Sequence, residues 1–211
     1  MNSIEIVQPH VERTIGRVKT VFHEIISDDL HIDLLHVGST LLRPYEVVVT
    51  SGMSALPMNV PQGISAPSFA EVLVILPKGW PMKKDDFFDE KNYWPIRLLK
   101  DVARYTHHQK TWIGYGHTIA MAESEQTKTR PEQYAPGTDF CAALIMPPLT
   151  LGNKAWVLKG KDGQDIYFWS VIPLYSLELQ LKMEQGLDSL LNLFDRHKVF
   201  DRINPSRKSV V

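Results

Sequence analysis

The chain has 211 residues, of which 44% are hydrophobic and 22% are charged, and its formal net charge is -1. This composition is typical of a globular protein with one substantial core, and the near-zero charge gives no overall field that would attract nucleic acid or an anionic membrane. The single cysteine, Cys141, excludes an internal disulfide framework and a thiolate zinc cage and fits a reducing cytoplasm. The N-terminus lacks the pattern of a secretory signal, and no apolar run is long enough to span a bilayer.

The first predicted element is a helix over residues 11–26, because apolar residues recur there at three- and four-residue steps. One face of this helix would carry Val11, Ile15, Val18, Phe22 and Ile25. We therefore interpret residues 1–29 as an N-terminal helical segment that belongs to the same domain as the residues that follow.

Three strands and a helix are predicted next. Short runs rich in apolar and β-branched residues favour strands over residues 32–37, 45–50 and 69–76. Asn92 is the predicted N-cap of the helix, and Pro95 is tolerated in its first turn. The apolar face of this helix continues to about residue 105.

The second half of the chain is richer in predicted strands. They cover residues 116–120 and 139–146, with a polar loop over 123–137 between them, and then a hairpin of 155–158 with 166–172, closed by Pro173. Two helices, 175–185 and 187–197, meet at Gly186. This order predicts an α+β fold: a single domain, residues 30–200, with a mixed, mainly antiparallel β-sheet packed against helices, followed by a polar tail over residues 201–211.

No group of residues in the sequence makes a convincing catalytic or metal site. Ser51 and Ser54 follow a strand, but no nucleophile elbow surrounds them and no histidine or acid follows nearby, so we expect them to serve turn hydrogen bonding. His31 and Asp33 would share one face of a strand while His36 points to the other, which disfavours a joint metal site.

The remaining titratable groups also favour structural roles. The adjacent His107 and His108 diverge in any regular structure and suit the C-terminus of a helix. Cys141 lies in an apolar strand, as a buried inert thiol would. His117 follows a Gly-x-Gly pair, which leaves open a ligand site or an acid–base role in the region from Gly114 to His117, although no partner group is identifiable.

One charge cluster stands out before the central helix. Four acids surround two phenylalanines in the acidic-aromatic segment, which consists of Asp85, Asp86, Phe87, Phe88, Asp89 and Glu90. A solvated face whose phenylalanines fold back on the core is one interpretation. The other is a contact surface for a basic protein partner, and the segment is our candidate partner-binding site.

Several dispersed motifs, in the right order, resemble the Suppressor of fused domain family, and the resemblance covers about residues 32–186. The motifs are Arg43-Pro44-Tyr45 through Thr50-Ser51-Gly52-Met53-Ser54 with Pro57-Met58, residues 71–76 with Pro77 and Trp80, Tyr93-Trp94-Pro95-Ile96 with Leu99-Lys100, Thr111-Trp112 with Gly116-His117-Thr118, Pro147-Pro148, and Ile172-Pro173-Leu174-Tyr175 with Glu178.

The resemblance implies a non-catalytic protein-binding domain without a cofactor or metal. Eukaryotic relatives are larger two-part proteins that sequester a transcription factor, and we expect this chain to correspond to their first part. Short bacterial members are implicated as immunity proteins, so the resemblance implies an antitoxin that binds and neutralises a cognate toxin, for example a nuclease, in the cytoplasm. No direct contact with nucleic acid or membrane is expected.

Two alternatives remain open. The first is a general interaction adaptor without a toxin partner, and the second is a small-molecule-binding protein or enzyme that uses the region from Gly114 to His117. The sequence leaves the oligomeric state open, although an uncovered edge strand would permit a dimer. It does not identify the partner or the surface that the partner contacts.

Overall fold

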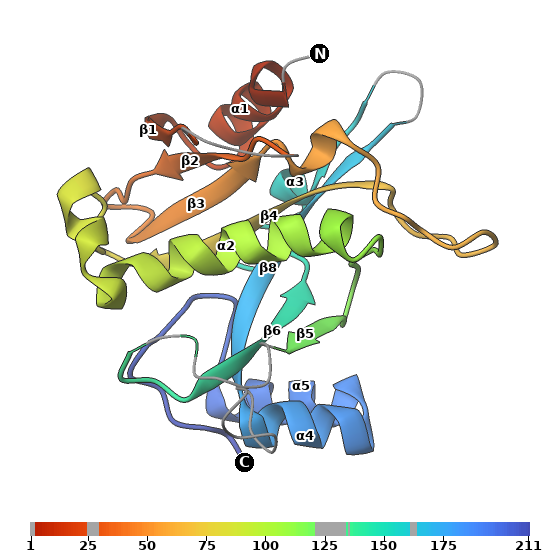
Figure 1. The fold of residues 1–211 in the computed structure, drawn as a ribbon. Coiled ribbons are helices and arrows are strands. Elements are labelled where there is room, and N and C mark those ends of the chain that lie inside the picture. The colour runs from red at the N-terminus through yellow and green to blue at the C-terminus, as the bar shows by residue number, and fades with distance from the viewer. Residues whose placement is uncertain (1–2, 25–29, 121–133, 135, 161–163) are drawn as a thin grey trace.

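A computed structural model of the chain describes residues 3–24, 30–120, 134, 136–160 and 164–211. Its centre is an eight-stranded sheet in the order β1-β2-β3-β4-β8-β6-β5, with β7 paired to β8 (Figure 1). The strands are β1 Val18–Phe22, β2 Asp33–Val37, β3 Tyr45–Ser51, β4 Phe69–Pro77, β5 Thr118–Ala120, β6 Phe140–Met146, β7 Val157–Leu158 and β8 Ile166–Tyr175.

Helices join these strands and cover the sheet. They are α1 Ser3–Thr14, η1 Met53–Ala55, η2 Lys84–Phe88, α2 Glu90–His108, α3 Asn153–Trp156, α4 Ser176–Gln185 and α5 Leu187–His197. Strands β4 and β8 run parallel, and the other described pairs are antiparallel. The predicted fold class, an α+β domain with a mixed and mainly antiparallel sheet, is confirmed.

The two faces of the sheet bury alternate residues of the same strands. In β3, Val48 belongs to the core under α2, whereas Val47 and Val49 belong to the core under α1. The same alternation in β6 sends Ala143 toward the α2 side and the neighbouring Leu144 toward α4 and α5. Since successive strand residues point to opposite faces, α1, α4 and α5 lie on the face opposite α2.

The predicted N-terminal helix is wrong over its second half. The helix lies earlier, as α1, and residues 18–22 form the outer strand β1 instead. Gly16, with φ at 149°, follows the end of α1 in a conformation that a side chain rarely adopts. The apolar spacing misled because Val18 and Phe22 are four residues apart, a separation that places them on one face in a helix and in a strand alike. Ile25 lies outside the described residues.

The predicted strand over residues 155–158 is wrong at 155–156, which belong to the helical turn α3, where Ala155 N–H donates to the Gly152 carbonyl oxygen, and only 157–158 form a strand, β7. The other elements follow the prediction with shifted ends. Helix α2 begins at Glu90 and its N-cap is Asp89, not Asn92. Strand β8 continues through Pro173, which is opposite Ala143 of β6. Among the described residues, β8 pairs with β4 only as far as Ser170, so the missing N–H of the proline breaks no bond to that neighbour. The predicted polar loop over 123–137 falls mostly outside the described residues.

The C-terminal segment, predicted as a polar tail, packs against the domain. Arg202 forms a bridge with Ile75 of β4, and Ile203 is buried in the core under α2. Further on, the Arg207 guanidinium lies against the fully buried Glu178 carboxylate of α4, with N–O distances of 2.5 and 2.7 Å. The same guanidinium stacks over the rings of Phe140 and Tyr175. The ion pair between Arg207 and the buried Glu178 thus holds the C-terminal segment against the domain.

Candidate partner-binding surface

The acidic-aromatic segment covers most of η2, the N-cap Asp89 and the first residue of α2, Glu90. Its two phenylalanines have different environments. The Phe87 ring is half-buried, with its centre 5.0 Å from that of Phe22 and 5.7 Å from that of Tyr93. Phe88, in contrast, is 88% exposed. One ring therefore folds back on the core, as the solvated-face interpretation expects, and the other remains available for contact.

Three of the four carboxylates in the segment hold local structure. Asp86 accepts a hydrogen bond from the Lys83 backbone N–H at 2.8 Å, and Asp89 caps α2 by accepting from Lys91 N–H at 2.9 Å. Glu90 accepts from Nε of Arg97 at 2.9 Å. Asp85 is exposed and makes none of the described hydrogen bonds or ion pairs. The structure thus leaves Asp85 and Phe88 as the members of the segment that are most accessible to a partner.

A second polar site lies in the turn over residues 51–54, where the sequence predicted hydrogen bonding by serine. The fully buried Glu71 of β4 supplies the acceptor. One of its oxygens accepts from the backbone N–H groups of Gly52 and Ser54, each at 3.0 Å, and from the Ser54 hydroxyl at 2.6 Å; the other accepts from the Thr50 hydroxyl at 2.6 Å. Ser54 therefore fixes backbone geometry, and the buried glutamate that it contacts was not singled out in the sequence.

Gly52 occupies a position in this turn that no residue with a side chain fits. Its φ is 138°, and a Cβ there would overlap the backbone oxygen of His31. We expect Gly52→Ala to lower the free energy of unfolding by about 2 to 4 kcal/mol, because the change adds backbone strain and a clash with another segment. Urea unfolding followed by circular dichroism measures the loss.

Gly63→Ala is the matched control. Gly63 has φ at 85°, but nothing lies within 4 Å of the added Cβ, so only the left-handed conformation is penalised, by about 1 kcal/mol. Equal losses in the two variants would show that the contact with His31 adds nothing.

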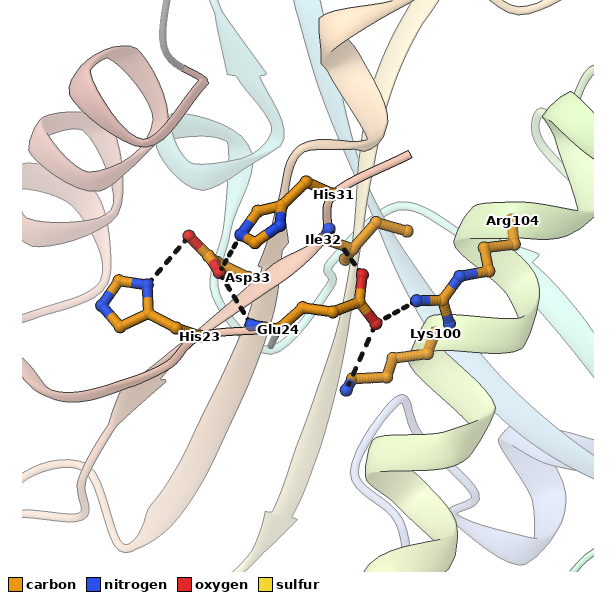
Figure 2. A network of polar contacts seen from close by, with 7 residues as sticks. All are labelled: His23, Glu24, His31, Ile32, Asp33, Lys100 and Arg104. Atoms are coloured by element: carbon orange, nitrogen blue, oxygen red, sulfur yellow. Dashed lines mark hydrogen bonds and ion pairs between the residues drawn. The ribbon is translucent and has the colours of Figure 1, made fainter. Parts of the chain in front are cut away.

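The histidines near β2 do not meet at one point. Asp33 lies between two of them and accepts from both, with 3.2 Å to Nδ1 of His23 and 2.9 Å to Nε2 of His31 (Figure 2). His36 instead contacts Glu46 of β3 at 2.9 Å. Burial alone would raise the pKa of Glu46, but hydrogen bonds from His36, Ser39 and Gly79 bring that pKa below its ordinary value. Among the described residues, no three His, Cys, Asp or Glu side chains are placed to hold one metal ion.

Glu24, next to this cluster, was missed by sequence reasoning. Its carboxylate accepts from Ile32 N–H at 3.1 Å and points toward α2, where it pairs with Arg104 and lies 3.8 Å from Nζ of Lys100 (Figure 2). These contacts tie the segments around β1 and β2 to the central helix. No local pattern could reveal them, because the partners are about 80 positions apart in the chain.

The remaining candidate side chains differ in burial: Cys141 is buried, His107 and His117 are half-buried, and His108 is exposed. Burial lowers the pKa of His107, whose Nε2 lies 3.1 Å from the Met53 carbonyl oxygen. Burial also lowers the pKa of His117, whose ring lies 4.3 Å from that of Trp112. A Cβ on Gly116 would approach the Leu187 side chain to 2.6 Å, so the absence of a side chain at Gly116 lets Leu187 of α5 pack closely against it. Burial raises the pKa of the Cys141 thiol to about 11, which leaves it protonated at neutral pH.

Comparison with known proteins identifies the fold. The family model described as Suppressor of fused protein (SUFU) matches residues 28–208. A candidate SUFU homolog from Neisseria gonorrhoeae superposes with a TM-score of 0.67 at 16% identity, over 99% of this chain and 97% of that one. A chain of the Sufu-Fu complex gives 0.65 at 12% identity, over 99% and 92% of the two chains.

Drosophila Suppressor of Fused also gives a TM-score of 0.65 at 12% identity, and the match covers 99% of this chain but 51% of that one. The chain thus spans about half the length of the Drosophila protein. Comparison with curated sequences finds no match. Within the described residues, no helix combines the length and apolar character needed to cross a bilayer.

Proposed function

Because the chain belongs to the Suppressor of fused protein family, we propose that it is a non-catalytic protein-binding domain, and specifically an immunity protein that occludes a toxin in the cytoplasm. The observation that carries the binding function is the family match over residues 28–208. The fold is shared with a protein whose structure was determined in a Sufu-Fu complex. The packed environments of His117 and Cys141 support a role without catalysis.

The acidic-aromatic segment supports one contact surface of this domain. Exposed aromatic rings beside a charge are frequent anchors in protein interfaces, and an acidic surface suits the basic substrate cleft of a nuclease toxin. Phe88 would be the apolar anchor and Asp85 the free charge. Asp86, Asp89 and Glu90 would act indirectly, because their local hydrogen bonds hold the segment in shape.

Growth rescue tests this proposal. The protein is co-expressed in bacteria with the toxin encoded by a neighbouring gene, and we expect the wild type to restore growth. Asp85→Lys with Phe88→Ser should weaken toxin affinity roughly tenfold to hundredfold, as loss of an interface anchor does, and should reduce rescue. Affinity is measured by calorimetry on the purified pair.

The matched control is Met183→Ser with Glu184→Lys, which makes the same change in charge at another exposed site, where Met183 is 69% exposed. Rescue by the control but not by the Asp85 and Phe88 variant supports the surface. Unchanged rescue by both variants removes the segment from the interface. If wild-type protein fails to rescue, the immunity role is wrong and an adaptor role becomes the better interpretation.

A further inference from the structure

A cationic cavity lies between the start of β1 and the loop that joins β2 to β3. Its volume is about 630 Å³, and its lining includes Arg17 and Lys19 from the β1 side and Arg43 from the loop. None of these three cations forms an ion pair with a carboxylate in the part of the chain that the structure describes. The cavity therefore gathers three cations without an ion pair among the described residues, in a chain whose net charge is -1, and the nearby Glu12 carboxylate accepts from the Val18 backbone N–H at 3.3 Å.

Two glycines lie beside these cations. A Cβ on Gly38 would overlap the Lys19 side chain, and a Cβ on Gly16 would lie 3.4 Å from Nη2 of Arg43. Arg43 is also held in place, since its guanidinium donates to the carbonyl oxygens of Gly38 and Tyr45. The backbone thus lets two long cations lie close to it and fixes the orientation of one of them.

The same loop presents two leucines to solvent. Leu41 is 95% exposed and Leu42 is 99% exposed. A tight turn carries them, because Thr40 N–H donates to the Arg43 carbonyl oxygen at 2.9 Å and Arg43 N–H donates to the Thr40 hydroxyl at 3.0 Å. Two adjacent, fully exposed leucines on one hydrogen-bonded turn form a small apolar patch beside the cationic cavity.

Positive charge continues beyond the cavity. The Arg43 guanidinium lies over the Tyr45 ring, 5.5 Å from its centre, and Tyr45 in turn lines a second cavity together with Arg202. This second cavity of about 340 Å³ is also lined by Lys198, and the adjacent Phe200 is 48% exposed. The second cavity thus also combines cations with an exposed apolar side chain.

We propose that the cationic cavity binds an acidic segment of a partner protein, with Leu41 and Leu42 packing against apolar side chains beside the acids. Carboxylates are the complementary ligands for the arginine fork and the lysine ammonium. A protein segment fits better than a membrane, because a planar bilayer would meet the leucine tip without filling the cavity, and two leucines with few cations make a weak anchor. This inference rests on the proposed protein-binding function and assigns it a second surface.

Nuclear magnetic resonance titration tests the inference directly. The probe is a synthetic peptide that alternates glutamate with leucine, and its control is the same peptide with lysine in place of glutamate. We expect the acidic peptide to shift the amide signals of residues 15–19 and 38–43, and the basic peptide to leave them unchanged. Arg17→Glu with Lys19→Glu should weaken the acidic peptide roughly tenfold, since two exposed charge contacts are lost.

The matched variant, Lys91→Glu with Lys154→Glu, makes the same change in net charge at exposed lysines elsewhere, and it should bind the peptide like the wild type. Equal weakening in both double variants, shifts confined to other residues, or no binding would overturn the inference. A separate experiment measures sedimentation of the protein with vesicles that contain anionic phosphatidylglycerol. Binding to the vesicles but not to the peptide would show that the cavity recognises a membrane and not a protein segment.

Growth rescue separates this inference from the proposed function. If wild-type protein rescues and the Arg17 and Lys19 variant rescues equally well, the cavity is not part of the toxin interface while the immunity role stands. If the wild type does not rescue, the immunity role fails, and the peptide titration still decides whether the cavity recognises acidic segments.

Discussion

Replacing Arg207 with alanine is expected to lower the free energy of unfolding by about 3 to 5 kcal/mol, because the change leaves the Glu178 carboxylate buried without its cationic partner. Glu178 is fully buried and accepts from both terminal nitrogens of Arg207. The guanidinium also donates to the Pro173 carbonyl oxygen at 2.8 Å and covers the Tyr175 ring, so hydrogen bonding and packing are lost together. Urea unfolding at neutral pH measures the change.

A paired replacement shows whether the charge or the volume matters. Glu178→Gln with Arg207→Met removes both charges and keeps a side-chain acceptor beside the backbone N–H groups of Tyr175 and Val210, which Glu178 binds at 2.9 and 3.1 Å, so we expect it to cost much less than Arg207→Ala alone. If the single and the paired variants are equally unstable, the buried carboxylate is not the source of the loss. Arg207→Lys should fall between them, because lysine keeps the charge without the two-pronged geometry.

Glu71→Ala is the second change with a large expected effect. It removes the acceptor for the Gly52 and Ser54 backbone N–H groups, and an unsatisfied buried donor costs about 1 to 3 kcal/mol. With two such donors, and with the contacts to the Thr50 and Ser54 hydroxyls lost as well, we expect stability to fall by about 3 to 5 kcal/mol.

The amide variant Glu71→Gln provides the comparison. It keeps the shape and one acceptor oxygen but turns an amide donor toward one set of N–H and hydroxyl donors, so we expect roughly half the loss of the alanine variant. Hydrogen exchange at the amides of Gly52 and Ser54 is the local measurement. Unchanged protection of these amides in Glu71→Ala would show that the turn over residues 51–54 finds other acceptors.

The errors in the predicted elements have identifiable physical causes. Strands such as β4 and β6 were predicted well because long apolar runs carry their own signal in the sequence. Residues 18–22 were assigned to a helix because their spacing fits both periods, and pairing with β2 decides between them. Asn92 is a suitable cap by residue type alone, whereas Asp89 is the residue whose side-chain oxygen accepts from the Lys91 N–H.

The candidate site was likewise predictable from the sequence only in part. The sequence indicated the acidic-aromatic segment, but it could not tell Phe87, which packs against Phe22, from Phe88, which remains exposed. It likewise could not bring Arg17 and Lys19 to the side of Arg43, because this requires the pairing of β1 with β2 and of β2 with β3.

By itself, the sequence determined the fold class and the order of most elements, since periodicity and turn residues act over a few neighbouring positions, and its dispersed motifs pointed to the family by resemblance. The tertiary structure alone decided which charged side chains are satisfied internally and which remain for a partner. That outcome depends on contacts such as Glu24 with Arg104 or Glu178 with Arg207, whose members are far apart in the chain and meet only when the sheet and its helices pack.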